Sequence, residues 1–460
     1  MAALDGKDLI GWGFVPGPWF GEALGVANAM RARGEGDEAI RAHLTTLMPK
    51  PPERRPLRAE TPGYAAFIEP ENDDEGANVA QVRAAMDAIL RVPTLKAGAI
   101  MPDACPTGPN DIPVGGVVAA KNAIHPGFHS ADICCSMALT VLERDEDAAT
   151  VMDAAAAHVH FGPMRRPEGH VAIPGVLRAE VTANPFLKGL EDLAELHFGT
   201  QGDGNHFYYV GRLESTGQPA IVSHHGSRGL GAKLYRRGME AADRHRAQVC
   251  PEAPRGMAWI EADTDEGRAY WDALQVVRRW TKASHFAVHD AILARLGARA
   301  ADRFWNEHNF VFRRDDGRYY HAKGATPSYR GFSADDDGRT LIPMNMAEPI
   351  LITAHADKAE ALGFAPHGAG RNMSRSRFLR ENAPALPEGI DVRFHCGIPD
   401  LSELPQAYKS AAQVTGMIEK HGLARVQDRV LPYGSIMAGD WERDAPWRKK
   451  REAKKAQAKS

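Results

Sequence analysis

The segment from His125 to Met137, HPGFHSADICCSM, places an aspartate, two adjacent cysteines and two histidines within thirteen residues. Asp132 and Cys135 are three positions apart across a tight DICC turn, so both side chains could point into one pocket. A thiolate with imidazoles suits a borderline ion such as Zn²⁺ or Mn²⁺, and an added carboxylate favours harder ions or a two-metal cluster. Because one cysteine can bridge two metals, metal ligation would explain a thiol beside a carboxylate.

Four histidines could complete such a site, since each lies among glycine or small polar residues. They are His206 in GTQGDGNHF, His224 in SHHGSRGLG, His308 in NEHNFVF and His367 in PHGAGRNMSR. Glycine costs chain entropy, so runs of glycine indicate sharp turns or close approach of the backbone to a ligand. HFAVH, by contrast, sets His285 and His289 four apart without the glutamate of an HExxH site, and we expect a solvated or core-edge pair there.

The HGSRG and HGAGR segments also predict anion binding. Backbone N–H groups in glycine-rich turns form anion-binding nests, and Arg228, Arg371 and Arg375 lie in or next to these segments. Arginine forks bind phosphate through two parallel hydrogen bonds. A pocket that joins metal ligands to phosphate binders indicates phosphoryl or nucleotidyl transfer.

Composition bounds the class of protein. At 460 residues the chain can form one large domain or two to three ordinary ones, and its five cysteines, an odd number, do not form a disulfide framework. The first residues lack a basic stretch followed by an apolar one, and no apolar run approaches about eighteen residues. We therefore expect a globular, cytoplasmic protein that does not contact a membrane.

The chain divides by composition into three parts. Residues 1–60 predict a helical appendage, with two helices between 18 and 48 broken at GEG and a Pro-rich connector, followed by a catalytic domain over 61–440. Residues 441–460 end in RKKREAKKAQAKS, with seven Lys or Arg against one Glu, and predict a basic, disordered tail.

Periodicity within the large domain favours an α+β fold with mixed or antiparallel sheets surrounded by helices. Short β-prone runs such as AIVSHH and NFVFRR alternate with Gly/Pro turns, without a βαβ rhythm. Amphipathic helices are expected at 79–92, 147–159, 176–197, 231–249 and 265–298.

These motifs together resemble the RtcB-type RNA-splicing ligases over roughly residues 98–439. The resemblance rests on MPD with a following GGV, then ADICCSM, GDGNHF, HHGSRG, EHN, KGAT, IPMNM, HGAGRNMSR and AYK, in that order. It implies an RtcB-like fold and a centre of two Mn²⁺ ions. The implied ligands are Asp132, Cys135, His206, His224 and His308, with Cys135 as the bridge. Zn²⁺ would also accept this ligand set.

The resemblance further implies that His367 attacks the α-phosphate of GTP and becomes a guanylyl-histidine. The activity would join an RNA 3′-phosphate, or a 2′,3′-cyclic phosphate after hydrolytic opening, to a 5′-hydroxyl, as in RNA repair or tRNA splicing. Asn205 would contact the nucleotide phosphate, and Tyr408 would lie near the guanine. The residues implied in nucleotide binding are Asn205, Tyr209, Asn309, Pro343, Met344, Asn345, Met346, Gly368, Ala369, Gly370 and Tyr408.

RNA would be bound mainly through its phosphates by Arg228, Arg371 and Arg375, and binding should therefore depend strongly on salt. A monomer is expected, and an activating protein partner is left open. Two alternatives remain at this point. One is a metal-dependent phosphodiesterase or phosphatase for RNA ends, and the other is a non-catalytic RNA-end-binding paralogue.

Several positions depart from the family pattern around the base. Tyr209 stands where the family has a glutamate that recognises the base, PMNM at 343–346 replaces a P-G-S-M turn, and Ala438 precedes Gly439 where the family has a lysine. DACPTGP also replaces the more usual D-V-H-x-G segment. These departures predict a divergent member whose metal ligands and nucleophile are intact and whose contacts with the base are altered.

Overall fold

A computed structural model describes residues 3–17, 19–48, 52–162, 166 and 171–443. The chain divides into two compact units, Met1–Arg54 and Arg55–Ser460. Of the basic tail expected at 441–460, residues 444–460 lie outside the described part of the chain.

The first unit is helical and has a core of its own. Its helices are α1 (Gly6–Gly11), α2 (Phe20–Ala32) and α3 (Asp37–Leu47). The break expected at GEG is found between α2 and α3, where Gly36 is the N-cap of α3. Leu9, Ala27, Ile40 and Leu44 are fully buried against one another, so this unit buries its apolar side chains internally.

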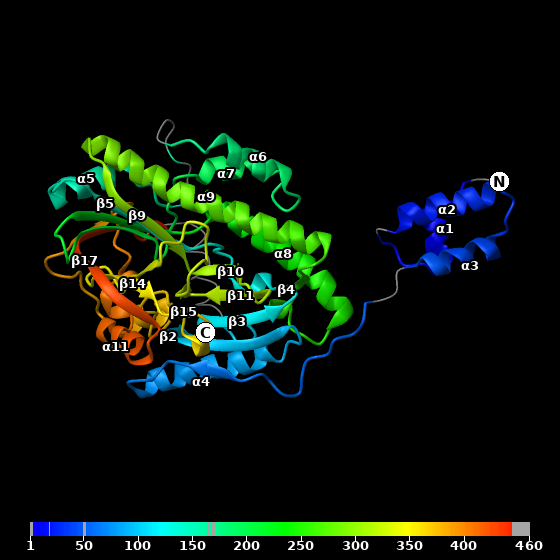
Figure 1. Cartoon of the computed structure of the whole chain (residues 1–460), viewed down its shortest axis with the longest axis horizontal. Helices are drawn as coiled ribbons and strands as arrows, with labels where there is room; N and C mark the ends of the chain where they lie inside the picture. Colours follow the sequence, from blue (N-terminus) through cyan, green and yellow to red (C-terminus); the bar gives the residue numbers. More distant parts are fainter. Residues whose placement is uncertain (1–2, 18, 49–51, 163–165, 167–170, 444–460) are drawn as a thin grey trace, which may run out of the picture. The chain divides into compact units, whose positions relative to one another are not determined.

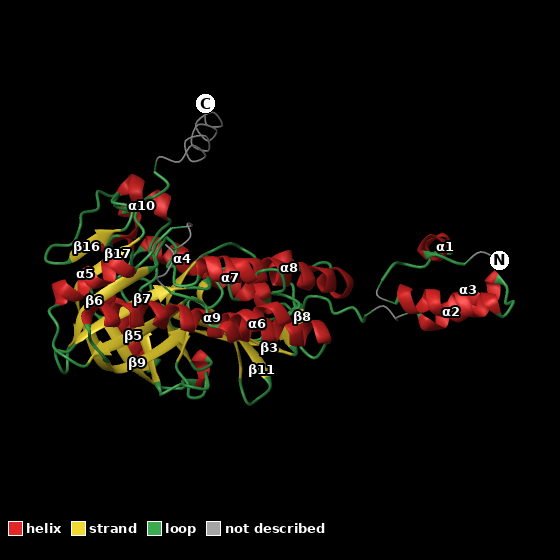
Figure 2. Cartoon of the chain, turned by 90° about the horizontal axis from the view of Figure 1, so that it is seen from above, coloured by secondary structure: helices red, strands yellow, loops and turns green. Residues whose placement is uncertain are grey.

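The second unit carries the remaining helices (Figures 1 and 2). They are α4 (Asp73–Leu90), α5 (Ala148–His158), α6 (Gly175–Ala183), α7 (Glu191–His197), α8 (Arg228–Val249), α9 (Asp265–Leu296), α10 (Arg375–Glu381) and α11 (Ala411–His421). Short 3₁₀ turns are η1 (Pro126–Phe128), η2 (Arg255–Met257), η3 (Ala359–Ala361), η4 (Leu401–Glu403) and η5 (Pro405–Ala407). Each expected amphipathic segment is helical, although their boundaries differ by several residues.

One expected helix, 176–197, is two helices in the structure. The chain leaves the helix at Asn184, whose side chain accepts a hydrogen bond from the Phe186 N–H and donates one to the Ala269 carbonyl. Pro185 follows directly and offers no N–H to a continuing helix. Apolar residues recur at helical spacing through both helices, and this spacing therefore did not predict the break between them.

The strands form two main sheets, which confirms the predicted α+β fold with mixed and antiparallel pairing. The strands are β1 (Tyr64–Ala66), β2 (Leu95–Cys105), β3 (Val114–Lys121), β4 (Ala123–Ile124), β5 (Ser136–Leu142), β6 (Phe207–Leu213), β7 (Pro219–His225), β8 (Ile260–Glu261), β9 (Ala300–Glu307), β10 (Asn309–Arg313), β11 (Arg318–Lys323), β12 (Ala325–Pro327), β13 (Arg339–Ile342), β14 (Ile350–His355), β15 (Phe364–Pro366), β16 (Asp391–Phe394) and β17 (Ala424–Met437). The larger sheet has the order β13-β14-β17-β6-β7-β5-β9, and β16 joins β17 in parallel. The other has the order β1-β2-β3-β11-β10, with β1 parallel to β2.

Helix α9 supports the larger sheet from behind. Thr264 caps its start by accepting a hydrogen bond from the Gly267 N–H, and Gly297 ends it with a φ of 60°. Apolar residues at helical spacing, such as Val277, Val288 and Ile292, are buried. Helix α9 runs beside α8, as Figure 1 shows, and packs against β5 and β7.

The pair His285 and His289 on α9 is fully buried, which corrects the expectation of a solvated or core-edge pair. The Ser223 hydroxyl lies 2.7 Å from a ring nitrogen of each, and Ser136 and Thr140 lie 3.0 and 2.9 Å from the others. The polar faces of β5 and β7 thus supply partners that an amphipathic helix pattern cannot show.

Within the described residues, no helix is both long enough and apolar enough to cross a membrane.

We expect the free energy of unfolding to fall on acidification. Burial lowers the pKa of His125 and of His289 to about 3, below the ordinary value of 6.5. Between these values the unfolded chain binds more protons, so the contribution is fully present above about pH 6.5 and is lost as the pH falls toward 3. Urea unfolding at pH 7, 6 and 5 should show a loss approaching ~1.4 kcal/mol per pH unit for each such histidine. Equal stability at pH 7 and pH 5 would contradict this expectation.

Candidate active site

Antiparallel pairing brings three chemically active side chains to one end of the larger sheet. β5 pairs with both β7 and β9, so the residue before β5 lies near the ends of the other two strands. That residue is Cys135, while His224 lies at the end of β7 and His308 directly follows β9. All three are buried.

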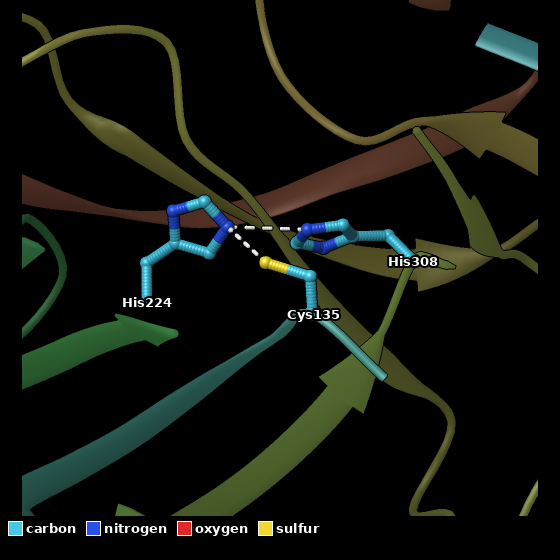
Figure 3. Close-up of side chains that lie close together, drawn as sticks. All are labelled: Cys135, His224 and His308. Atoms are coloured by element: carbon cyan, nitrogen blue, oxygen red, sulfur yellow. Dashed lines mark hydrogen bonds between the residues drawn. The ribbon is translucent and has the colours of Figure 1, made fainter. Parts of the chain in front are cut away.

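The side-chain atoms of these three residues converge, as Figure 3 shows. Cys135 Sγ lies 3.1 Å from His224 Nε2, which in turn lies 3.1 Å from His308 Nε2. On the other side, Cys135 Sγ lies 3.4 Å from His206 Nε2, and that nitrogen lies 3.1 Å from Asp132 Oδ2. The five predicted ligands therefore form two groups that share Cys135, each compact enough to hold one ion.

Hydrogen bonds from the far side of two rings fix which nitrogen faces the cluster. His206 Nδ1 lies 2.7 Å from the Gln201 carbonyl, and His224 Nδ1 lies 3.2 Å from the Asn205 carbonyl. Since a carbonyl only accepts, each Nδ1 carries the proton and each Nε2 presents a lone pair. This is the arrangement in which metal-binding histidines are usually held.

The protonation of the buried groups fits a cation. Burial lowers the pKa of His224 to about 3 and that of His308 well below its ordinary value, so both rings are neutral at pH 7. Burial and the Asp132 carboxylate raise the pKa of the Cys135 thiol. A proton can be shared by only two of these acceptor atoms at a time. A divalent cation binds several of their lone pairs at once and stabilises the thiolate. The donor set therefore fits one or two divalent ions.

His367 lies beside this cluster and is oriented by a buried carboxylate. Its ring centroid is 5.0 Å from that of His308. Asp103 Oδ2 accepts hydrogen bonds from the His367 ring Nδ1, at 2.5 Å, and from its backbone N–H, at 3.1 Å. Because a carboxylate accepts, Nδ1 carries a proton, and in the neutral form of the ring the lone pair is then on Nε2. A neutral imidazole held in this way can act as a nucleophile.

Asp103 is in turn held by a lysine that the sequence analysis did not single out. Lys409 is 4% exposed, and its Nζ donates to the carbonyls of Pro102 and Ala104, both at 3.2 Å. Lys409 therefore fixes the backbone on both sides of Asp103. Both residues belong to motifs quoted above, MPD and AYK, but nothing in those motifs shows that the two residues meet.

A pocket opens next to His367. Most of the residues predicted to bind a nucleotide line it, namely Asn205, Tyr209, Pro343, Met344, Asn345, Met346, Gly368, Ala369, Gly370 and Tyr408. Asn309 does not line it; its side-chain oxygen accepts a hydrogen bond from the Gly324 N–H at 2.7 Å. The structure thus brings together all of the predicted nucleotide residues except Asn309.

The three predicted phosphate-binding arginines differ in their surroundings. Arg371 and Arg375 line the pocket and both pair with the buried carboxylate of Glu403, at 3.4 and 2.5 Å. Arg228 is the first residue of α8. Burial lowers the pKa of its guanidinium group, and the nearby carboxylate of Asp132 acts in the opposite direction. Arg228 is therefore the arginine whose charge acts on the metal-ligand cluster.

Two glycines of the sequence motifs make room for the protein's own site residues. A Cβ at Gly226 would lie 2.0 Å from Asp132 Oδ1, and one at Gly370, where φ is 70°, would lie 2.1 Å from the Asp103 carbonyl oxygen. These glycines were expected to mark anion-binding turns or close approach to a ligand. At both positions the space that a side chain would need is taken by the side chain or the backbone of an aspartate in the site.

The chain is similar to known ligases over most of its second unit. The family model described as "tRNA-splicing ligase RtcB" matches residues 175–438, a range that contains the three ligand histidines and His367 but begins after Asp132 and Cys135. The tRNA-splicing ligases RtcB of Archaeoglobus fulgidus and Aeropyrum pernix are 29% identical in alignments 292 and 302 residues long, which cover 54% and 56% of this chain. Each alignment covers 61% of the archaeal protein. The RNA-splicing ligase RtcB of Mycobacterium tuberculosis is 25% identical in an alignment 313 residues long, which covers 59% of this chain and 71% of that protein.

Gly226→Ala should weaken metal binding, because the added methyl group would displace the Asp132 carboxylate. Disturbing a residue that orients a ligand typically costs ~10- to 100-fold in metal affinity. The measurement is Mn²⁺ bound per chain during titration of the metal-free protein. Gly416→Ala is the matched control, since its Cβ within α11 would meet nothing within 4 Å. Wild-type affinity in Gly226→Ala would show that this contact does not position the ligand.

Proposed function

The chain belongs to the RtcB family, and we propose from this that it is an RNA ligase dependent on GTP and a divalent metal. It would join RNA ends that carry a 3′-phosphate, or a 2′,3′-cyclic phosphate after hydrolysis, to ends that carry a 5′-hydroxyl. The observation that carries the proposal is the position of His367. An imidazole oriented by Asp103 lies next to His308 of the ligand cluster and lines the pocket that contains most of the predicted nucleotide-binding residues.

The ligand cluster would hold the metal. Asp132, Cys135 and His206 form one candidate site, and Cys135, His224 and His308 form the other. Mn²⁺ is the ion that the family implies, and Zn²⁺ also suits these ligands. When bound, the ions would offset negative charge on the phosphates that enter the site.

His367 would carry the covalent step. Its Nε2 attacks the α-phosphate of GTP, a P–N bond forms, and pyrophosphate leaves. Asp103 keeps the proton on Nδ1 and stabilises the positive charge that develops on the ring. The RNA 3′-phosphate then takes GMP from His367, which returns to neutral imidazole. Finally the 5′-hydroxyl attacks that 3′-phosphate, the phosphodiester forms, and GMP leaves.

The Asp103–His367 contact favours this function over a phosphodiesterase or phosphatase. Metal-assisted hydrolysis needs the ligands and a water molecule, and it has no use for an imidazole held with a free Nε2 beside the cluster. A non-catalytic RNA-binding protein would have no use for either feature. Arg228, which lies near Asp132, is the residue best placed to bind an RNA phosphate at the ligand cluster.

The proposal is tested by covalent labelling. The Mn²⁺-loaded protein is incubated with α-labelled GTP, and acid-labile, base-stable label on the chain is expected, as a phosphoramidate requires. His367→Ala should abolish the label while retaining the metal. An absence of label on wild-type protein shown to hold its metal would overturn the proposal.

Asp103→Asn should slow labelling by ~10²-fold or more, because an amide can donate to Nδ1 and so favour the wrong tautomer of His367. The rate of label formation is compared with that of Asp74→Asn, which makes the same chemical change at an exposed carboxylate paired with Arg377. Metal content should stay at the wild-type level in both variants. An unchanged rate in Asp103→Asn would show that the short contact does not prepare the nucleophile.

A further inference from the structure

The pocket beside His367 is lined mainly by apolar side chains on the wall formed by β6, the end of β17 and the 343–346 turn. These are Phe207, Tyr209, Met344, Met346 and Met437. Four of the five are at least 90% buried, and the fifth, Phe207, is partly buried and packs against the clusters that contain Tyr209, Met346 and Met437. Such a wall can contact the face of any base by dispersion and by sulfur–aromatic contact.

Selecting guanine requires acceptors for its edge. Guanine presents N1–H and the N2 amino group as donors, whereas adenine presents an acceptor at N1 and an amino group at N6. A site that pairs with such groups rejects an analogue lacking them by a large factor, while an apolar pocket discriminates weakly. The pocket would therefore need a free carboxylate or carbonyl to prefer guanine strongly.

Among the described residues that line the pocket away from the metal ligands, Glu403 is the only carboxylate, and its oxygens are already engaged. Oε1 accepts from Arg375 Nε at 2.5 Å, and Oε2 accepts from Arg371 Nη1 at 3.4 Å and from the Tyr408 hydroxyl. The Glu403 side chain is fully buried. Turning it toward a base would break its contacts with two cations.

The other polar side chains on the same wall are also bonded to the protein. The Tyr209 hydroxyl donates to the Val430 carbonyl at 3.0 Å, and the Ser435 hydroxyl donates to the Tyr208 carbonyl at 3.3 Å. Asn345 Oδ1 accepts from the Ala347 N–H at 2.9 Å, which leaves the Asn345 amide group as a donor. Among the side chains of this wall, what remains for a base is this donor and the lone pairs of neutral hydroxyls, which serve adenine and guanine alike.

We propose that this pocket accepts adenine as well as guanine, so that ATP modifies His367 at no less than one tenth of the efficiency of GTP. The inference rests on the proposed function, because it concerns the nucleotide consumed at the same histidine. It follows from two observations: the Glu403 carboxylate already accepts hydrogen bonds from Arg371, Arg375 and Tyr408, and the wall of the pocket is apolar. With ATP the balance is the same: Nε2 bonds to the α-phosphorus, pyrophosphate leaves, and AMP remains on the ring.

The first test compares two triphosphates on the Mn²⁺-loaded full chain. Initial labelling rates are measured with α-labelled ATP and with α-labelled GTP at concentrations well below saturation, with His367→Ala beside each. A GTP-to-ATP rate ratio below ten is expected. A ratio above ten would overturn this inference and leave the ligase proposal standing. No label from either nucleotide would overturn the ligase proposal, and this inference with it.

The second test adds the missing acceptor. Asn345→Asp keeps the shape of the side chain and its bond to the Ala347 N–H while replacing the amide donor with a carboxylate oxygen. The GTP-to-ATP ratio should rise at least tenfold. Asn382→Asp, the same change at an exposed residue outside the pocket lining, should leave the ratio unchanged. An unaltered ratio in Asn345→Asp would show that a lack of acceptors does not set the base preference.

Discussion

The site depends on the crowding of lone pairs at one end of the larger sheet. The Nε2 atoms of His224 and His308 lie 3.1 Å apart, and Cys135 Sγ is as close to the first of them. Neutral acceptors at that separation repel unless a proton or a cation lies between them, and their burial excludes water. The sheet keeps them there because β5 is antiparallel to both neighbours and α9 holds β5 and β7 through buried hydrogen bonds.

A second set of contacts orients His367, the proposed nucleophile, and involves none of the five proposed metal ligands. Asp103 fixes the tautomer of His367, Lys409 fixes the backbone around Asp103, and Gly370 gives that backbone room. The pieces come from β2, the end of β15 and the loop before α11. His367 therefore follows β15 of the two-stranded β12-β15 sheet and is tied to β2 of the five-stranded sheet through Asp103, whereas Cys135, His224 and His308 lie at strand ends of the larger sheet.

Much of this could be predicted from the sequence, and the remainder has physical reasons. Helix period and turn residues predicted the α+β class, and motif types predicted which five side chains converge. The Asp103–His367 contact joins residues 264 positions apart, and only folding reveals such a pair. His285 looked like a surface residue because its partners, Ser136 and Ser223, lie on strands behind the helix. The role of Gly226 depends on where the Asp132 carboxylate lies, which no local pattern contains.

The antiparallel strand order has a consequence for synthesis. β5 can pair with β9 only after about 160 further residues have been synthesised. β6 can pair with β17 only after the chain has been synthesised as far as Met437. Contacts this distant in sequence form slowly, because loop closure comes before any stabilising contact. On the ribosome the chain would present Cys135 as an unprotected thiol long before His308 and His367 emerge. The cluster is thus completed only after His308 and His367 have been synthesised.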